Sequence, residues 1–74
     1  MQITVKLFAH FRNNRFKHEL RTIGPDTTVG AIAADLGLAE DELGVILING
    51  RHGSLDQALA EGDTLSLFPL VGGG

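Results

Sequence analysis

The chain has 74 residues, of which 43% are hydrophobic, and it carries a formal net charge of −3. These values predict one small globular domain of marginal stability and exclude a disordered chain. The absence of cysteine excludes disulfides, cysteine zinc sites and a thiol nucleophile. No apolar run approaches the roughly 20 residues that span a bilayer, and the first residues lack a signal-peptide pattern, so we expect a cytoplasmic protein without a membrane partner.

Charged residues are unevenly distributed along the chain. The first 21 residues hold five of the six lysines and arginines, and Arg51 is the only one in the acidic remainder. Such asymmetry can steer a charged partner, but it is too weak to indicate nucleic-acid binding. The three histidines, His10, His18 and His52, lie far apart in the sequence, so we expect no metal site.

The first residues predict a β-hairpin. Apolar and polar side chains alternate over residues 2–11, which is typical of a half-buried strand. The inward series includes Ala9, whereas Phe8 is an exception on the polar face. A turn at residues 13–14 leads into a second strand, in which Leu20 alternates with charged residues.

A helix is predicted after a break at residues 24–26. Thr28 has the residue type of an N-cap, and Gly37 stands where a left-handed C-terminal cap is expected. Between them, apolar residues recur at the spacing of one buried helical stripe: Val29, Ile32, Ala33 and Leu36. A short turn over residues 38–43 is expected to follow.

The remaining residues predict two more strands. Residues 45–48 form a continuous apolar run, which we interpret as an interior strand covered on both faces. After a turn at residues 49–50, capping-box spacing predicts one short helical turn over residues 55–59. Residues 64–68 predict a last strand that points Phe68 away from the core.

This order of elements predicts an α+β fold, a mixed sheet of four to five strands with one main helix packed on one face. If the last strand lies beside the first in parallel, Phe8 and Phe68 become neighbours on the open face. Clustered exposed aromatic side chains are typical of a docking surface. A single exposed phenylalanine is equally compatible with an ordinary surface, so Phe8 taken alone leaves both interpretations open.

The chain ends in three glycines after an apolar stretch. Because glycine lacks a Cβ, such a tail can thread a narrow channel and place its carboxylate in a partner's active site. That carboxylate is an anion at neutral pH and can attack an activated phosphate. A glycine-rich end can also be a simple linker. We predict a domain over residues 1–71 and a flexible tail over residues 72–74.

Several motifs, considered together, cover essentially the whole chain: Lys6-Leu7-Phe8-Ala9, Asn49-Gly50, Glu61-Gly62-Asp63, and Leu67-Phe68-Pro69 before a terminal Gly-Gly. In this combination the sequence resembles the MoaD/ThiS family of ubiquitin-like β-grasp sulfur-carrier proteins. The resemblance implies a ubiquitin-like β-grasp fold. It also implies a carrier that is not itself an enzyme and that binds no cofactor.

In proteins of this kind, an E1-like enzyme uses ATP to adenylate the C-terminal carboxylate. A sulfur donor, such as a cysteine desulfurase or a rhodanese-like protein, then converts it to a thiocarboxylate that supplies sulfur to a biosynthetic intermediate. The resemblance implies that Gly74 bears the sulfur and that Gly73 belongs to the reactive end. The residues that it implies for contact with partner enzymes are Phe8, Phe68, Pro69, Leu70 and Gly72.

Two positions leave the pathway open. Leu70 follows Pro69, where members of the molybdopterin type usually have a second proline, and Gly72 precedes the terminal pair, as is common in the thiamine type. We expect a molybdopterin role, as the small subunit of molybdopterin synthase beside its large subunit. The alternatives are a thiamine-thiazole carrier that serves a thiazole synthase, a ubiquitin-like modifier conjugated through Gly74, and a non-covalent binding module with an idle tail.

Overall fold

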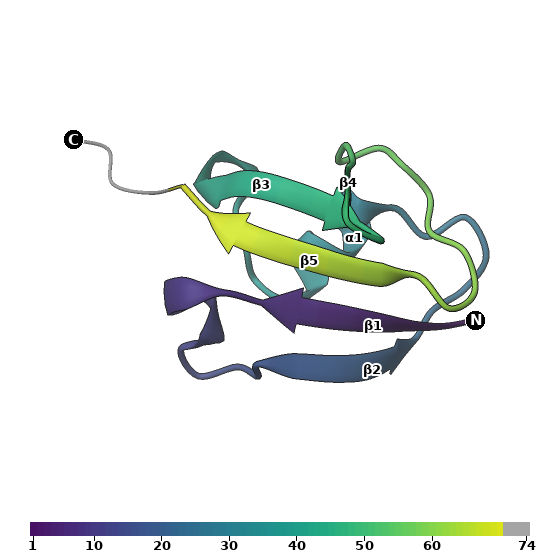
Figure 1. Cartoon of the computed structure of the whole chain (residues 1–74), viewed down its shortest axis with the longest axis horizontal. Helices are drawn as coiled ribbons and strands as arrows, with labels where there is room; N and C mark the ends of the chain where they lie inside the picture. The colour runs from purple at the N-terminus through teal and green to yellow at the C-terminus, as the bar shows by residue number, and fades with distance from the viewer. Residues whose placement is uncertain (71–74) are drawn as a thin grey trace.

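The computed structural model describes residues 1–70, which form one five-stranded mixed sheet with a single α-helix on one face (Figure 1). The strand order is β2-β1-β5-β3-β4, and β1 and β5 are parallel whereas the other neighbours are antiparallel. The elements are β1 (Gln2–Leu7), the 3-10 helix η1 (Ala9–Arg12), β2 (His18–Thr22), α1 (Val29–Asp35), the 3-10 helix η2 (Glu40–Glu42), β3 (Leu43–Ile48), β4 (Arg51–His52) and β5 (Thr64–Pro69). The predicted α+β architecture is confirmed, and the first and last strands pair in parallel, which is the condition under which Phe8 and Phe68 were expected to be neighbours.

The core lies between the sheet and α1. Alternate residues of β1 and β5 point into it, because side chains of a strand alternate between the two faces of the sheet. Val29, Ile32 and Ala33 of α1 cover them, as the helical stripe predicts. The fully buried strand residues are Ile3, Val5, Leu7, Leu65 and Leu67. Each such aliphatic side chain contributes roughly 1.5–3 kcal/mol by leaving water.

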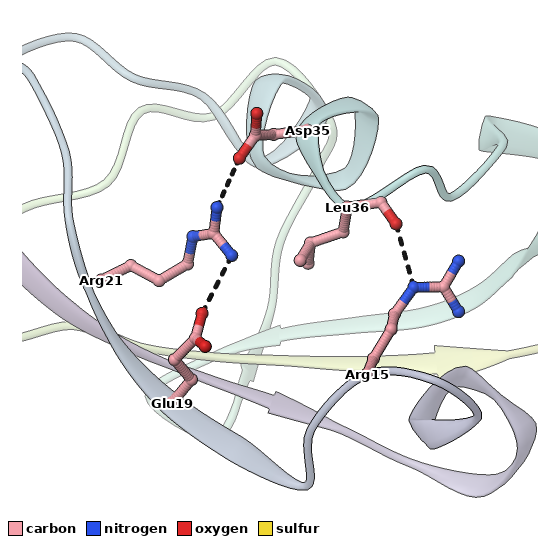
Figure 2. A network of polar contacts seen from close by, with 5 residues as sticks. All are labelled: Arg15, Glu19, Arg21, Asp35 and Leu36. Carbon is pink, nitrogen blue, oxygen red and sulfur yellow. Dashed lines mark hydrogen bonds and ion pairs between the residues drawn. The ribbon is translucent and has the colours of Figure 1, made fainter.

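The predicted caps of α1 are present. The Thr28 Oγ1 accepts a hydrogen bond from the Ala31 N–H at 3.2 Å. Gly37 has a φ of 77°, and the Leu38 N–H donates to the Ala33 carbonyl at 2.9 Å, which completes a Schellman motif. Arg15 adds a cation at this helix end, because its Nε donates to the Leu36 carbonyl at 2.9 Å (Figure 2).

The first strand is shorter than predicted. It ends at Leu7, and the chain then turns at Ala9, which is exposed and has a φ of 53°. The following 3-10 helix brings Phe11 into the core, with 1% of its surface exposed. The prediction that Ala9 points inward is therefore wrong, because Phe11 fills that end of the core.

The open face of the sheet also differs from the prediction. Val45 of β3 is 37% exposed, so this strand is covered on one face and not on both. In β2, the pairing of Ile3 with Arg21 places Arg21 on the helix side of the sheet. Leu20 consequently lies on the open face and is 65% exposed.

Residues 55–56 form a single hydrogen-bonded turn, in which the Gln57 N–H donates to the Ser54 carbonyl at 3.2 Å, but the predicted helix does not form and Ala58 instead makes an isolated bridge with Thr28. The Ser54 hydroxyl bonds the Asp56 carboxylate at 2.7 Å and does not cap a helix. Two carbonyls of this segment accept hydrogen bonds from the first N–H groups of α1, Leu55 from Gly30 at 2.8 Å and Gln57 from Val29 at 3.0 Å. Because those N–H groups have no partner within the helix, the two carbonyls of this connection satisfy them.

None of the helices within residues 1–70 is long and apolar enough to cross a membrane.

The predicted turns at residues 13–14 and 49–50 are present, with Asn14 and Asn49 in the left-handed region. The second turn is followed by β4, a two-residue strand that the sequence pattern does not predict.

Gly44 occupies a bulge where β3 shifts register against β5. A Cβ at this position would lie 2.7 Å from the Pro69 carbonyl oxygen and 3.0 Å from the Leu70 Cα. The end of β5 therefore packs directly on the glycine backbone, and no side chain fits between them.

We predict that Gly44→Ala lowers the free energy of unfolding by about 1–3 kcal/mol, because the added methyl group forces the backbone of β5 to move. Gly24→Ala is the matched control, since a Cβ there meets no atom within 4 Å. Urea unfolding followed by circular dichroism measures both. Equal stability of the two variants would contradict the close packing of Gly44 on β5.

Candidate functional site

Two phenylalanines stack at one end of the central strand pair. Phe8 follows β1 and Phe68 belongs to β5, and their ring centroids lie 4.1 Å apart with an interplanar angle of 9°. The parallel register aligns Leu7 with Leu67, and the Phe8 N–H donates to the Leu67 carbonyl at 3.2 Å. Both rings are half-buried on the open face. The predicted proximity of Phe8 and Phe68 is confirmed.

Val45 and Arg12 extend this surface. Val45 lies opposite Phe68 in the pairing of β3 with β5, so its exposed side chain shares the same face. We call Phe8, Phe68 and Val45 the aromatic patch. The Arg12 guanidinium lies 5.4 Å from the centre of the Phe8 ring, and its Nε donates to the Leu7 carbonyl at 2.8 Å. A cation thus borders the aromatic patch at the Phe8 ring.

Sequence reasoning did not identify Val45 or Arg12 as members of this surface. The apolar run of 45–48 gives no sign that only one face is covered. Arg12 reaches Phe8 because the chain reverses through η1, and the alternating pattern predicted a continuous strand there. The one available signal was the spacing of four residues between Phe8 and Arg12. This spacing indicates that the two side chains are close only if the segment between them is helical.

The chain leaves β5 beside the aromatic patch. Pro69 is the last residue of β5 and is buried, and Leu70 is 61% exposed. The Leu70 N–H donates to the Glu42 carbonyl at 2.9 Å, which fixes the backbone at this point. The structure therefore defines the direction of the chain as far as Leu70, at the sheet end that carries Phe8 and Phe68 (Figure 1).

Three of the predicted site residues, Gly72, Gly73 and Gly74, lie outside the described residues. The predicted boundary between domain and tail at residues 71–72 also falls there. The partner-binding roles of Phe8, Phe68, Pro69 and Leu70 stay predictions. Of these four, Pro69 presents its side chain to the interior and the other three contribute to the surface.

One further polar cluster within residues 1–70 links two turns. The Asn49 amide bonds the Asp63 carboxylate at 2.8 Å and accepts from the Thr64 N–H at 2.9 Å, which joins two turns. No group of three or more potential metal ligands occurs among the described residues. The candidate site is the aromatic patch together with the end of β5.

Comparison with known proteins identifies the family. The model of the ThiS family matches residues 5–74. No curated protein matches the sequence.

Solved structures share the whole fold. Small archaeal modifier protein 1 of Haloferax volcanii is 28% identical with a TM-score of 0.76, and the alignment covers 95% of this chain and 98% of that one. The HVO 2177 protein of the same organism is 30% identical with a TM-score of 0.80, covering 100% and 87%. A complex of subunits 1 and 2 of the molybdopterin-converting factor from Helicobacter pylori contains a chain that is 22% identical, with a TM-score of 0.66 and full coverage of both chains.

The match to the family model spans nearly the entire sequence, and the similar structures reproduce the five-stranded sheet with one helix. The chain belongs to the ThiS family and has the ubiquitin-like β-grasp fold that the resemblance predicts.

Proposed function

We propose that this protein is a sulfur carrier that is loaded at the carboxylate of Gly74. An E1-like enzyme would join the carboxylate to the AMP part of ATP, with release of pyrophosphate. The terminal sulfur of a persulfide on the sulfur donor would then displace AMP to give an acyl disulfide, and attack by a thiol on the donor's sulfur would break the S–S bond and release the thiocarboxylate, leaving a disulfide on the donor side. The carrier itself supplies no catalytic side chain and no bound cofactor in this scheme, and ATP belongs to the activating enzyme.

One observation carries this proposal: a ThiS-family chain has an aromatic patch beside the strand that leads toward its terminal glycines. Aromatic side chains contribute large contact area at protein interfaces. The stacked rings are held by the sheet, so they need little ordering when a partner binds. The Leu70 N–H bonds the Glu42 carbonyl, so the backbone has a fixed position as far as Leu70. A partner that docks on the aromatic patch would therefore bind next to the point from which the chain continues to Gly74.

The chemistry explains why activation is needed. A carboxylate is a weak nucleophile and a poor acceptor, whereas a mixed anhydride with AMP has a good leaving group. The resulting thiocarboxylate is a far better nucleophile than a carboxylate, so it can pass sulfur to an acceptor. Sulfur carried at a chain end also needs no cysteine, and the sequence has none.

We propose molybdopterin synthesis as the pathway, with this chain as the small synthase subunit. The Phe68-Pro69 pair supports it, as does the fold shared with a chain in the H. pylori complex of subunits 1 and 2 of the molybdopterin-converting factor. A thiazole synthase is the alternative partner, favoured by Gly72 and by the name of the matching family.

A second candidate function is protein modification. It is favoured by the 28% identity to small archaeal modifier protein 1. In this case the activated Gly74 carboxylate would be joined to lysines of other proteins. Both functions share the same activation step.

We predict that incubation with ATP, the cognate E1-like enzyme and a sulfur source raises the mass of the protein by ~16 Da, as expected when sulfur replaces one carboxylate oxygen. Intact-protein mass spectrometry measures this change. A chain without Gly73 and Gly74 is the control and should keep its mass. An unchanged mass of the full chain would rule out the carrier proposal.

Blotting of cell extract separates the carrier from the modifier. A modifier predicts a ladder of covalent conjugates that disappears when Gly74 is deleted. A carrier predicts the free protein alone. A Gly74-dependent ladder together with no mass gain would make modification the function.

We predict that Phe68→Ala weakens binding to the E1-like enzyme by about tenfold or more, because a central aromatic contact contributes on the order of 2 kcal/mol. Leu20→Ala is the control, since Leu20 is exposed on the same face but pairs with Thr4, four residues before Phe8. Calorimetric titration measures the affinities, and thermal melts verify folding. Equal affinities of the two variants would contradict docking on the aromatic patch.

A further inference from the structure

The sheet has two edges of unequal character. At one edge β4 has only two residues, Arg51–His52, and offers little backbone for pairing. At the other edge β2 has five residues, His18–Thr22, and lies along the lower border of the sheet in Figure 1. Edge strands are commonly protected by charged side chains, especially lysine, by proline, by bulges or by shortness. The strand β2 contains no proline, no lysine and no break in its register with β1, and its acid and base, Glu19 and Arg21, bond each other.

The hydrogen bonds to β1 show which backbone groups of β2 face outward. Ile23 and Met1 exchange two hydrogen bonds, of 2.7 and 2.9 Å, and the Leu7 N–H donates to the Lys17 carbonyl at 3.0 Å. Bonded and non-bonded pairs alternate in an antiparallel ladder. Glu19 and Arg21 therefore occupy bonded pairs, and the N–H and C=O groups of the other three residues point to the open edge: His18, Leu20 and Thr22.

The side chains of β2 are arranged so that the strand is complementary to a second, antiparallel copy of itself. Leu20 stands at the centre and is 65% exposed. On either side of it are one acid, Glu19, and one base, Arg21. When a second copy of the strand lies beside the first, related to it by a 180° rotation about an axis at Leu20, Glu19 of each copy faces Arg21 of the other.

We propose that β2 pairs in antiparallel fashion with β2 of a second copy of this chain, with Leu20 opposite Leu20 at the two-fold axis. Glu19 of each copy then faces Arg21 of the other, and His18 faces Thr22. This interaction is separate from the proposed carrier function and does not depend on it.

The register follows from the backbone. With Leu20 on the axis, all three outward-facing residues of each β2 fall in bonded pairs, so every exposed N–H and C=O of the strand gains a partner. Moving the axis to His18 or Thr22 would leave part of β2 opposite residues outside the strand. The Leu20 register is therefore the one that pairs the full strand.

Charges in the monomer support the same arrangement. Arg21 bonds Glu19 at 3.0 Å and also bonds Asp35 of α1 (Figure 2). One arginine thus stands between two carboxylates, and a guanidinium has five N–H donors. In the dimer, each guanidinium can also meet Glu19 of the other copy, across a non-bonded pair where side chains lie closest.

The dimer leaves the proposed docking surfaces open. Because the two β2 strands run in opposite directions, the two sheets join into one, with the two aromatic patches at opposite ends. A single pair of short strands buries less area than a standard interface, so we expect a dissociation constant on the order of 0.1–1 mM. Salt should weaken the dimer, since its charge pairs lie near solvent.

Sedimentation equilibrium of the full chain, from about 10 µM to about 2 mM, tests the proposal. The wild-type protein should approach the dimer mass with rising concentration. Leu20→Lys should stay monomeric, because it places two like charges opposite each other at the axis. Leu70→Lys is the matched control for self-association, since Leu70 is 61% exposed but lies away from β2, and it should dimerise like the wild type. Circular dichroism melts verify that both variants fold.

Nuclear magnetic resonance tests the register. As the concentration rises, the amide protons of His18, Leu20 and Thr22 should shift and exchange more slowly with solvent, whereas those of Glu19 and Arg21 should change less. A wild-type protein that stays monomeric at about 2 mM would overturn the proposal. So would a Leu20→Lys variant that still dimerises, or self-association that only Leu70→Lys removes, since the latter would place the contact near the aromatic patch.

Discussion

The parallel pairing of β1 with β5 is the constraint on which the rest of the structure depends. It places the first and last strands at the centre of the sheet, so residues more than fifty positions apart become neighbours. On one face it joins Leu7 and Leu67 in the core, and on the other it stacks Phe8 on Phe68. The same register thus builds both the stable interior and the candidate docking surface.

Around this pair, backbone contacts fix the end of the sheet where the candidate site lies. The Gly44 bulge allows β5 to pack closely, and the Glu42 carbonyl holds the Leu70 N–H. The helix α1 covers one face of the sheet, and within residues 1–70 no helix covers the other face, which carries the aromatic patch. One face of the sheet suffices for the core, so the other face can carry exposed side chains.

Much of this arrangement is predictable from the sequence, because local signals agree with the final packing. Thr28 and Gly37 mark the ends of α1, and strand alternation predicts the outward direction of Phe68. The predictions from the sequence fail where contacts between distant segments determine the local conformation. Phe11 enters the core through a reversal at Ala9 that alternation cannot reveal, and the exposure of Leu20 depends on a hairpin register set by a long connection. The path of residues 55–59 depends on the first N–H groups of α1, which belong to another segment and bond the Leu55 and Gln57 carbonyls.

We propose that partners bind the end of the sheet where β1 and β5 place the two stacked rings. Titration of the ¹⁵N-labelled protein with the E1-like enzyme tests it directly, by mapping which amide signals change. We expect the largest changes at Phe8, Phe68 and Leu70, and further changes in the signals of residues 71–74. Changes centred on α1 or on residues 49–63, with the signals of Phe8 and Phe68 unaltered, would contradict it.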